Sequence, residues 1–241
     1  MSEKTNAKAA KSAVQQHPNR LRVRLFRHHL PLFALSAASF MALYFTRPYK
    51  DALTRASFAT AYPALALLAA TLFIGPWNLL QRSRNPISID LRRDLGIWAG
   101  ILGILHTAIG QNVHLRGRPW LYYVYAPKEH HQFPLRHDLF GLANYTGAIS
   151  VLLLIALLAT SNDYSLRKFG TPRWKQLQRW NYAVFGLAVI HAFAYQGIEQ
   201  QRPPYVATII ICLVGTLCFQ VAGILTRRSA AKQKINDGRE S

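Results

Sequence analysis

The chain has 241 residues, of which 51% are hydrophobic, and its 29 Lys and Arg against 10 Asp and Glu give a net charge of +19. A basic chain attracts phosphate, so this charge alone would favour nucleic acid as a partner. The apolar residues, however, are gathered in blocks that basic segments separate, a pattern typical of multi-pass membrane proteins. The distribution of the charge therefore argues against a nucleic-acid partner and makes the lipid membrane the expected partner.

Six apolar blocks approach the roughly 20 residues that cross a bilayer core. They cover residues 30–46, 61–80, 95–113, 139–160, 181–196 and 204–226. We therefore expect an all-α fold, a six-helix transmembrane bundle over residues 30–226. A disordered basic arm, residues 1–29, is expected before it, and a basic tail, residues 227–241, after it.

The positive charges predict the orientation of this bundle. If the N-terminus is cytoplasmic, the cytoplasmic segments hold 21 Lys and Arg and the segments outside hold 8. Loops rich in Lys and Arg stay on the cytoplasmic side. Both termini are therefore expected in the cytoplasm, and a bacterial inner membrane is the location that we favour.

The third block, LGIWAGILGILHTAIG, contains a histidine, His106, and no formally charged residue. A buried imidazole needs a polar partner at membrane depth and by default marks a functional site. The competing interpretation is a histidine that is hydrogen-bonded within the packing of the helices. Arg92, Arg93 and Asp94, just before this block, are typical of an interfacial anchor, with a salt link as an additional role.

The loop from residue 114 to residue 138 contains four histidines and several aromatic residues. The aromatic residues indicate a belt at the outer membrane surface, on a strand or a short helix. Adjacent histidines such as His130 and His131 bind metal in some proteins and are solvated in most. If electrons leave the protein on the outside, this loop is where we expect the acceptor to dock.

The fifth block, NYAVFGLAVIHAFAY, contains a second histidine, His191, and no formally charged residue. This histidine is expected at the same depth in the membrane as His106. His106 lies ten residues after Gly96, and His191 lies eleven after Trp180. At 1.5 Å per residue both rings lie about 15 to 17 Å from the inner edge. Two imidazoles at one depth on separate helices suit axial ligation of one haem iron, which favours electron transfer over oxygen chemistry.

The residues around the two histidines resemble a known family. The segments RRDLGIWAGILGILH and LANYTGAISVLLLIALLATSNDYSLRKFGTPRWKQLQRWNYAVFGLAVIH resemble the ferric-reductase-like transmembrane domain family. Its six-helix core is shared by ferric reductases, NADPH oxidases and the haem-bearing membrane subunit of a bacterial methionine sulfoxide reductase system. The resemblance implies that His106 and His191 are the axial ligands of a b-type haem.

The chain departs from this family at two positions. Relatives with two haems carry an inner histidine pair about thirteen residues before the outer pair, and those positions hold Arg93 and Gln178 here. Neither is a usual haem ligand. The departure predicts one haem, with a flavin or a quinone as the alternative inner relay and with Arg93 and Gln178 as its candidate contacts.

The sequence contains no Gly-rich nucleotide-binding motif. Electrons are therefore expected from a separate donor, such as a reductase, a flavin or a quinol, and the chain is expected to be the electron-transfer component of a larger oxidoreductase system. The expected outside acceptor is ferric iron or a periplasmic reductase.

The alternative function is a histidine-dependent transporter or a structural membrane protein without haem. A proton-relay transporter would be expected to carry an acid within its spans, and the six blocks contain no Asp or Glu.

Overall fold

The computed structural model describes residues 21–46, 51–81, 89–115, 117–198 and 203–237, and these residues form an all-α fold. The helices are η1 (Leu25–His29), α2 (Leu30–Thr46), α3 (Ala52–Leu80), α4 (Ile89–Gly110), η2 (Pro119–Tyr122), η3 (Pro127–Glu129), α5 (Leu139–Ala159), α6 (Asp163–Gln178), α7 (Asn181–Ile198) and α8 (Pro203–Asp237). Within the described residues, the only strand-like pairing is an isolated bridge between Val124 and Leu135. The all-α prediction is confirmed.

Each of the six apolar blocks lies on a separate helix: α2, α3, α4, α5, α7 and α8. Four helical segments are long and apolar enough to cross a membrane, namely Leu21–Thr46, Ala52–Leu80, Leu139–Ala159 and Pro203–Gln233. The remaining two helices, α4 and α7, carry the two histidines. Charged residues at the start of α4 and the polar residues of α7 lower the hydropathy of these helices.

The first helix begins earlier than the sequence predicts. Residues 21–29, which the sequence predicts to be part of a disordered arm, are helical and continue directly into α2, with a π-helical turn at Leu25–His29. The rest of that arm lies outside the described residues. At the other end, α8 extends to Asp237, so the described part of the basic tail is also helical.

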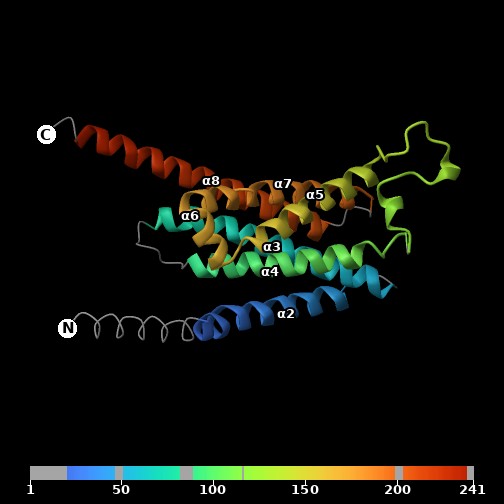
Figure 1. Cartoon of the computed structure of the whole chain (residues 1–241), viewed down its shortest axis with the longest axis horizontal. Helices are drawn as coiled ribbons and strands as arrows, with labels where there is room; N and C mark the ends of the chain where they lie inside the picture. The colour runs from blue at the N-terminus through green and yellow to red at the C-terminus, as the bar shows by residue number, and fades with distance from the viewer. Residues whose placement is uncertain (1–20, 47–50, 82–88, 116, 199–202, 238–241) are drawn as a thin grey trace.

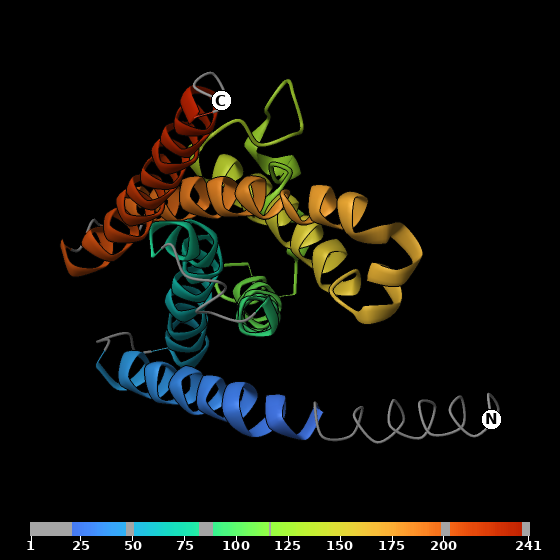
Figure 2. The same cartoon turned by 90° about the vertical axis from the view of Figure 1, so that its left-hand side faces the viewer.

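Most helices run along the long axis of the molecule, and the two ends of the bundle differ (Figure 1). The start of the first helix, the end of α8 and the short helix α6 lie at one end, while the loop with η2 and η3 lies at the opposite end (Figure 1). We call these the inner end and the outer end. The end view shows α2 at one edge of the bundle, against α3 (Figure 2).

Helix α3 is the central helix, because 56% of the residues in its most apolar window are buried, against 11% for the first helix and 22% for α8. The core joins leucines of α3, such as Leu68 and Leu72, to Ala99 of α4 and Val184 of α7. Large apolar side chains remain exposed along α2, α5 and α8. An exposed apolar surface of this extent is expected where helices face lipid.

Helices α6 and α4 are tied to the end of α5 by two hydrogen bonds that we call the inner clamp. Trp174 donates from Nε1 to the carbonyl of Thr160 at 3.0 Å, and Arg93 donates from Nε to the carbonyl of Ser161 at 2.7 Å. Carbonyls in the last turn of a helix have no partner within the helix. The inner clamp satisfies two carbonyls just past the end of α5.

Candidate cofactor site

Four helices, α3, α4, α5 and α7, surround a cavity in the outer half of the bundle. Its inner part is lined by apolar side chains, among them Leu65, Leu68 and Leu154. Towards the outer end the lining becomes polar. The polar residues there include Thr54, Tyr62, Gln111, His114, Asn144, Tyr195 and Gln196. The cavity therefore suits a ligand with an apolar body and a polar edge that faces outward.

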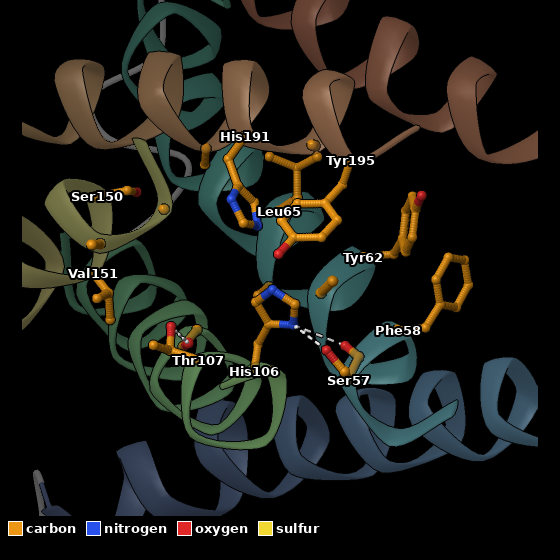
Figure 3. Close-up of a pocket in the computed structure, with 18 of the residues that line it drawn as sticks. Ser57, Phe58, Tyr62, Leu65, His106, Thr107, Ser150, Val151, His191 and Tyr195 are labelled. Atoms are coloured by element: carbon orange, nitrogen blue, oxygen red, sulfur yellow. Dashed lines mark hydrogen bonds between the residues drawn. The ribbon is translucent and has the colours of Figure 1, made fainter. Parts of the chain in front are cut away.

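The structure brings His106 and His191 together across this cavity. His106 projects from α4 and His191 from α7, and their ring centroids are 5.9 Å apart with the ring planes at 78° (Figure 3). In Figure 3 one ring nitrogen of each histidine points toward the other ring. Both side chains line the cavity, so neither faces the lipid.

The other ring nitrogen of each histidine is bound to a main-chain carbonyl. Nδ1 of His106 lies 2.9 Å from the carbonyl oxygen of Ser57 on α3, and Nδ1 of His191 lies 2.7 Å from that of Ala143 on α5. A carbonyl only accepts, so each Nδ1 carries the proton and donates it. Nε2 of each neutral ring then has its lone pair free, as metal ligation requires.

Close packing around Gly147 fixes the position of the His191 ring. A Cβ atom at Gly147 would lie 2.6 Å from Nδ1 and 2.9 Å from Cε1 of that ring. A real side chain could not sit there without moving the imidazole away from Ala143. The absence of a side chain on α5 is thus part of the site.

The inner positions Arg93 and Gln178 lie away from this cavity. Both contact Ser161. Arg93 donates to the carbonyl of Ser161, and Nε2 of Gln178 lies 3.4 Å from Oγ of Ser161. Arg93 also forms an ion pair with Asp163, with 2.7 Å between Nη1 and Oδ1. A second hollow of about 550 Å³ lies at the inner end. It is lined by Arg93 and Ser161 and by residues of the first helix and α4, among them Arg24 and Leu25.

Two of the outer histidines, His131 and His137, pack among aromatic rings of the outer loop. His131 stacks on Tyr125 with ring centroids 3.6 Å apart, and His137 lies 5.7 Å from His131. His130 occupies a left-handed backbone position with φ 49°. Among the described residues, no three or more His, Cys, Asp or Glu side chains are placed to hold a metal ion. Metal binding by His130 and His131 therefore stays a prediction from the sequence.

Sequence reasoning allowed a salt link at Asp94 but did not identify its partners, which form a charge cluster around it. This carboxylate is fully buried, pairs with Arg24, and lies 2.7 Å from Nδ1 of His28 and 3.3 Å from Nε2 of His29. Trp98 donates from Nε1 to Nδ1 of His29 at 3.3 Å, which leaves the Nε2 proton of His29 for Asp94. His28 and His29 lie in the π-helical turn before α2. The sequence pattern did not indicate that this turn would lie beside Asp94.

The sequence model of the family described as "Ferric reductase like transmembrane component" matches residues 60–189, more than half of the chain. The matched segment contains His106 and ends two residues before His191. A protein-methionine-sulfoxide reductase heme-binding subunit, MsrQ, from Yersinia pseudotuberculosis serotype O:1b (strain IP 31758) is 35% identical over 140 residues, which are 55% of this chain and 58% of that protein. The protein of the same name from Yersinia pestis (strain Pestoides F) is also 35% identical over 140 residues, 57% of its length. The alignments thus span less than three fifths of these relatives.

Proposed function

The chain belongs to the ferric reductase like transmembrane component family, and on this premise we propose that it is a haem-binding membrane subunit that carries electrons from the cytoplasmic side to an acceptor outside. It is a multi-pass membrane protein. His106 and His191 are the proposed axial ligands of one b-type haem. The observation that carries the proposal is the pair of imidazoles that face each other across one cavity, each with its Nδ1 proton bound elsewhere.

The separation of the two rings supports the fit. Two metal–nitrogen bonds of about 2 Å, plus about 1 Å from each nitrogen to its ring centre, require ring centroids about 6 Å apart. The observed separation is 5.9 Å. The cavity as it stands has a volume of about 210 Å³, so some of the apolar side chains at its edge must move outward to admit the macrocycle.

When bound, such a haem supplies one-electron redox chemistry with no open coordination position. The residues of the chain do the rest. The carbonyls of Ser57 and Ala143 hold the tautomer and the orientation of the two imidazoles. Apolar side chains from α3, α4, α5 and α7 exclude water from the inner part of the cavity.

If the chain binds one haem, its inner end is available to a separate electron donor. At that end the side chains of Arg93 and Gln178 are engaged with Ser161, which supports the absence of a second axial pair. The hollow lined by Arg22, Arg24, Arg93 and His29 has both basic and apolar walls, which suit a flavin or a quinol. We propose this hollow as the place where electrons enter, from such a molecule or from a reductase docked over it.

The acceptor side is proposed to be the outer loop. The relatives are named as the heme-binding subunit of a methionine sulfoxide reductase, so we propose a partner reductase outside the membrane as the acceptor, with ferric iron as the alternative. The charge bias favours the orientation in which both termini are cytoplasmic, and a bacterial inner membrane is the proposed location.

An optical spectrum of the purified protein, oxidised and then reduced with dithionite, tests this proposal. We expect the sharp bands of a low-spin b-type haem, at one haem per chain. His106→Ala and His191→Ala should abolish these bands, whereas Gln178→Ala and the surface variant His130→Ala should keep them. A colourless protein from haem-sufficient cells would contradict the proposal and favour the transporter or structural alternative.

A further inference from the structure

A third histidine, His114, lies at the outer mouth of the cavity. It follows the last turn of α4, is exposed on the outer side and also lines the cavity. From the sequence alone, His114 is one of four histidines in the outer loop, and loop histidines are solvated in most proteins. The structure instead places one face of this imidazole against the residues around His191.

Contiguous aromatic rings join His191 to His114. Tyr195 lies one helical turn after His191 on α7, and the two ring centroids are 4.9 Å apart. The ring of His114 stacks on Tyr195 at 6.1 Å with 19° between the planes. Phe140 of α5 closes the side of this stack, 5.7 Å from His114 and 6.2 Å from Tyr195. The series runs from a proposed haem ligand to the outer surface.

Hydrogen bonds hold both members of this stack in place. The buried phenol of Tyr122 donates to the carbonyl of Gly110 at 3.0 Å and accepts from the main-chain N–H of His114 at 2.9 Å and of Leu115 at 3.3 Å. The hydroxyl of Tyr195 donates to Oδ1 of Asn144 at 3.0 Å. The three main-chain contacts of this buried phenol tie the backbone at His114 to the end of α4.

We propose that His114 and Tyr195 form the exit through which electrons pass from the cavity to an acceptor bound at the outer mouth. The inference rests on the proposed function and adds two positioning residues to it. In each event one electron leaves the reduced cofactor and enters a one-electron oxidant. No bond to either ring forms or breaks, and neither ring retains the charge.

The test uses right-side-out membrane vesicles that contain the full chain, with hexacyanoferrate(III), which does not cross the membrane, as the oxidant. The rate of reoxidation of the reduced haem bands is measured by stopped flow. Removing a ring opens a gap in the path, so we expect His114→Asn and Tyr195→Leu to slow reoxidation about tenfold or more. His114→Phe and Tyr195→Phe keep the rings and should stay within about twofold of the unsubstituted protein.

The matched control is His130→Asn, which removes an exposed imidazole from the same loop and should not change the rate. Reoxidation of His114→Asn and Tyr195→Leu at the unsubstituted rate would overturn the proposal, as would equal slowing by His130→Asn. Loss of the haem bands in His114→Asn would also overturn it, since His114 would then hold the cofactor. Absence of haem bands from the unsubstituted protein would instead refute the proposed function.

A second readout does not depend on electron transfer. Diethyl pyrocarbonate modifies accessible imidazoles, and mass spectrometry of the digested protein locates the modified residues. We expect His114 to be modified from the outer side of the vesicles while His106 and His191 stay protected. An unreactive His114 would show that the mouth is closed to the outside and would overturn the proposed exit.

Discussion

An imidazole inside a membrane needs a partner for the ring nitrogen that does not bind metal, because no water is available to it. Both candidate ligands find this partner in a main-chain carbonyl of a neighbouring helix, Ser57 for His106 and Ala143 for His191. A substitution of the side chain at either carbonyl-bearing residue leaves the carbonyl in place. The ligand orientation is therefore most sensitive to residues that displace the ring itself.

Gly147 is the clearest such residue. Gly147→Ala would place a Cβ atom 2.6 Å from Nδ1 of His191, so the ring must turn away from the carbonyl of Ala143. We expect most of the haem absorbance to be lost, with a decrease of about 1–3 kcal/mol in the free energy of unfolding from overpacking. Gly186→Ala is the control, because nothing lies within 4 Å of a Cβ atom there. Equal spectra for both variants would contradict the proposed role of Gly147.

Two ion pairs at the inner end differ in burial and should differ in strength. Asp94 is fully buried, and Asp94→Ala would leave the charge of Arg24 without its partner, which should cost about 3–5 kcal/mol. The side chain of Asp163 is 42% exposed, so Asp163→Ala should cost about 1 kcal/mol or less despite its contact with Arg93. Thermal unfolding in detergent, followed by tryptophan fluorescence, measures both. Similar unfolding midpoints for the two variants would show that Asp94 does not anchor the first helix.

At the scale of elements, the inner clamp joins α4 and α6 to the end of α5. Trp174 on α6 and Arg93 on α4 donate to the successive carbonyls of Thr160 and Ser161, just past the end of α5. These contacts fix where α6 turns back. They also fix where α7 begins, and with it the depth of His191.

Within α6, Gly170 allows the chain to change direction. Its φ of 73° and ψ of 158° belong to a region that only glycine occupies readily. Gly170→Ala should therefore lower the free energy of unfolding by about 1–3 kcal/mol, whereas Lys168→Ala, at an exposed position of the same helix, should change it little. Circular dichroism during thermal unfolding measures this difference. An unchanged midpoint for Gly170→Ala would show that the kink is not needed.

The sequence predicted the helices better than it predicted the contacts between them. Apolar block length identified α2 and α5 closely, because a bilayer imposes a length on any helix that crosses it. It did not predict that the first helix would begin at Leu21, in a segment rich in charged residues. One of these residues, Arg24, pairs with the buried carboxylate of Asp94, which is distant in the sequence. The place of His114 at the mouth of the cavity was missed for the same reason: its neighbour Tyr195 is on another helix.

At the scale of the molecule, apolar surface and charge are arranged along different directions. Exposed leucines, isoleucines and valines cover the sides of α5 and α8, whereas the basic residues concentrate at the inner end, on α6 and at the end of α8. A membrane in which the helices stand upright satisfies both patterns. Under the proposed function, electrons would then enter at the hollow between the first helix and α4 and leave at the outer mouth beside His114.

Cysteine labelling tests this orientation. In a background in which Cys212 and Cys218 are replaced by alanine, Phe133→Cys introduces a thiol on the outer loop and Lys168→Cys introduces one on α6, both at exposed positions. Because the inner end carries the excess of positive charge, we expect a membrane-impermeant maleimide to label residue 133 in intact cells and residue 168 only after the membrane is opened. Equal labelling of both after detergent treatment is the control for thiol reactivity. Labelling of residue 168 but not residue 133 in intact cells would invert the bundle and reverse the proposed direction of electron flow.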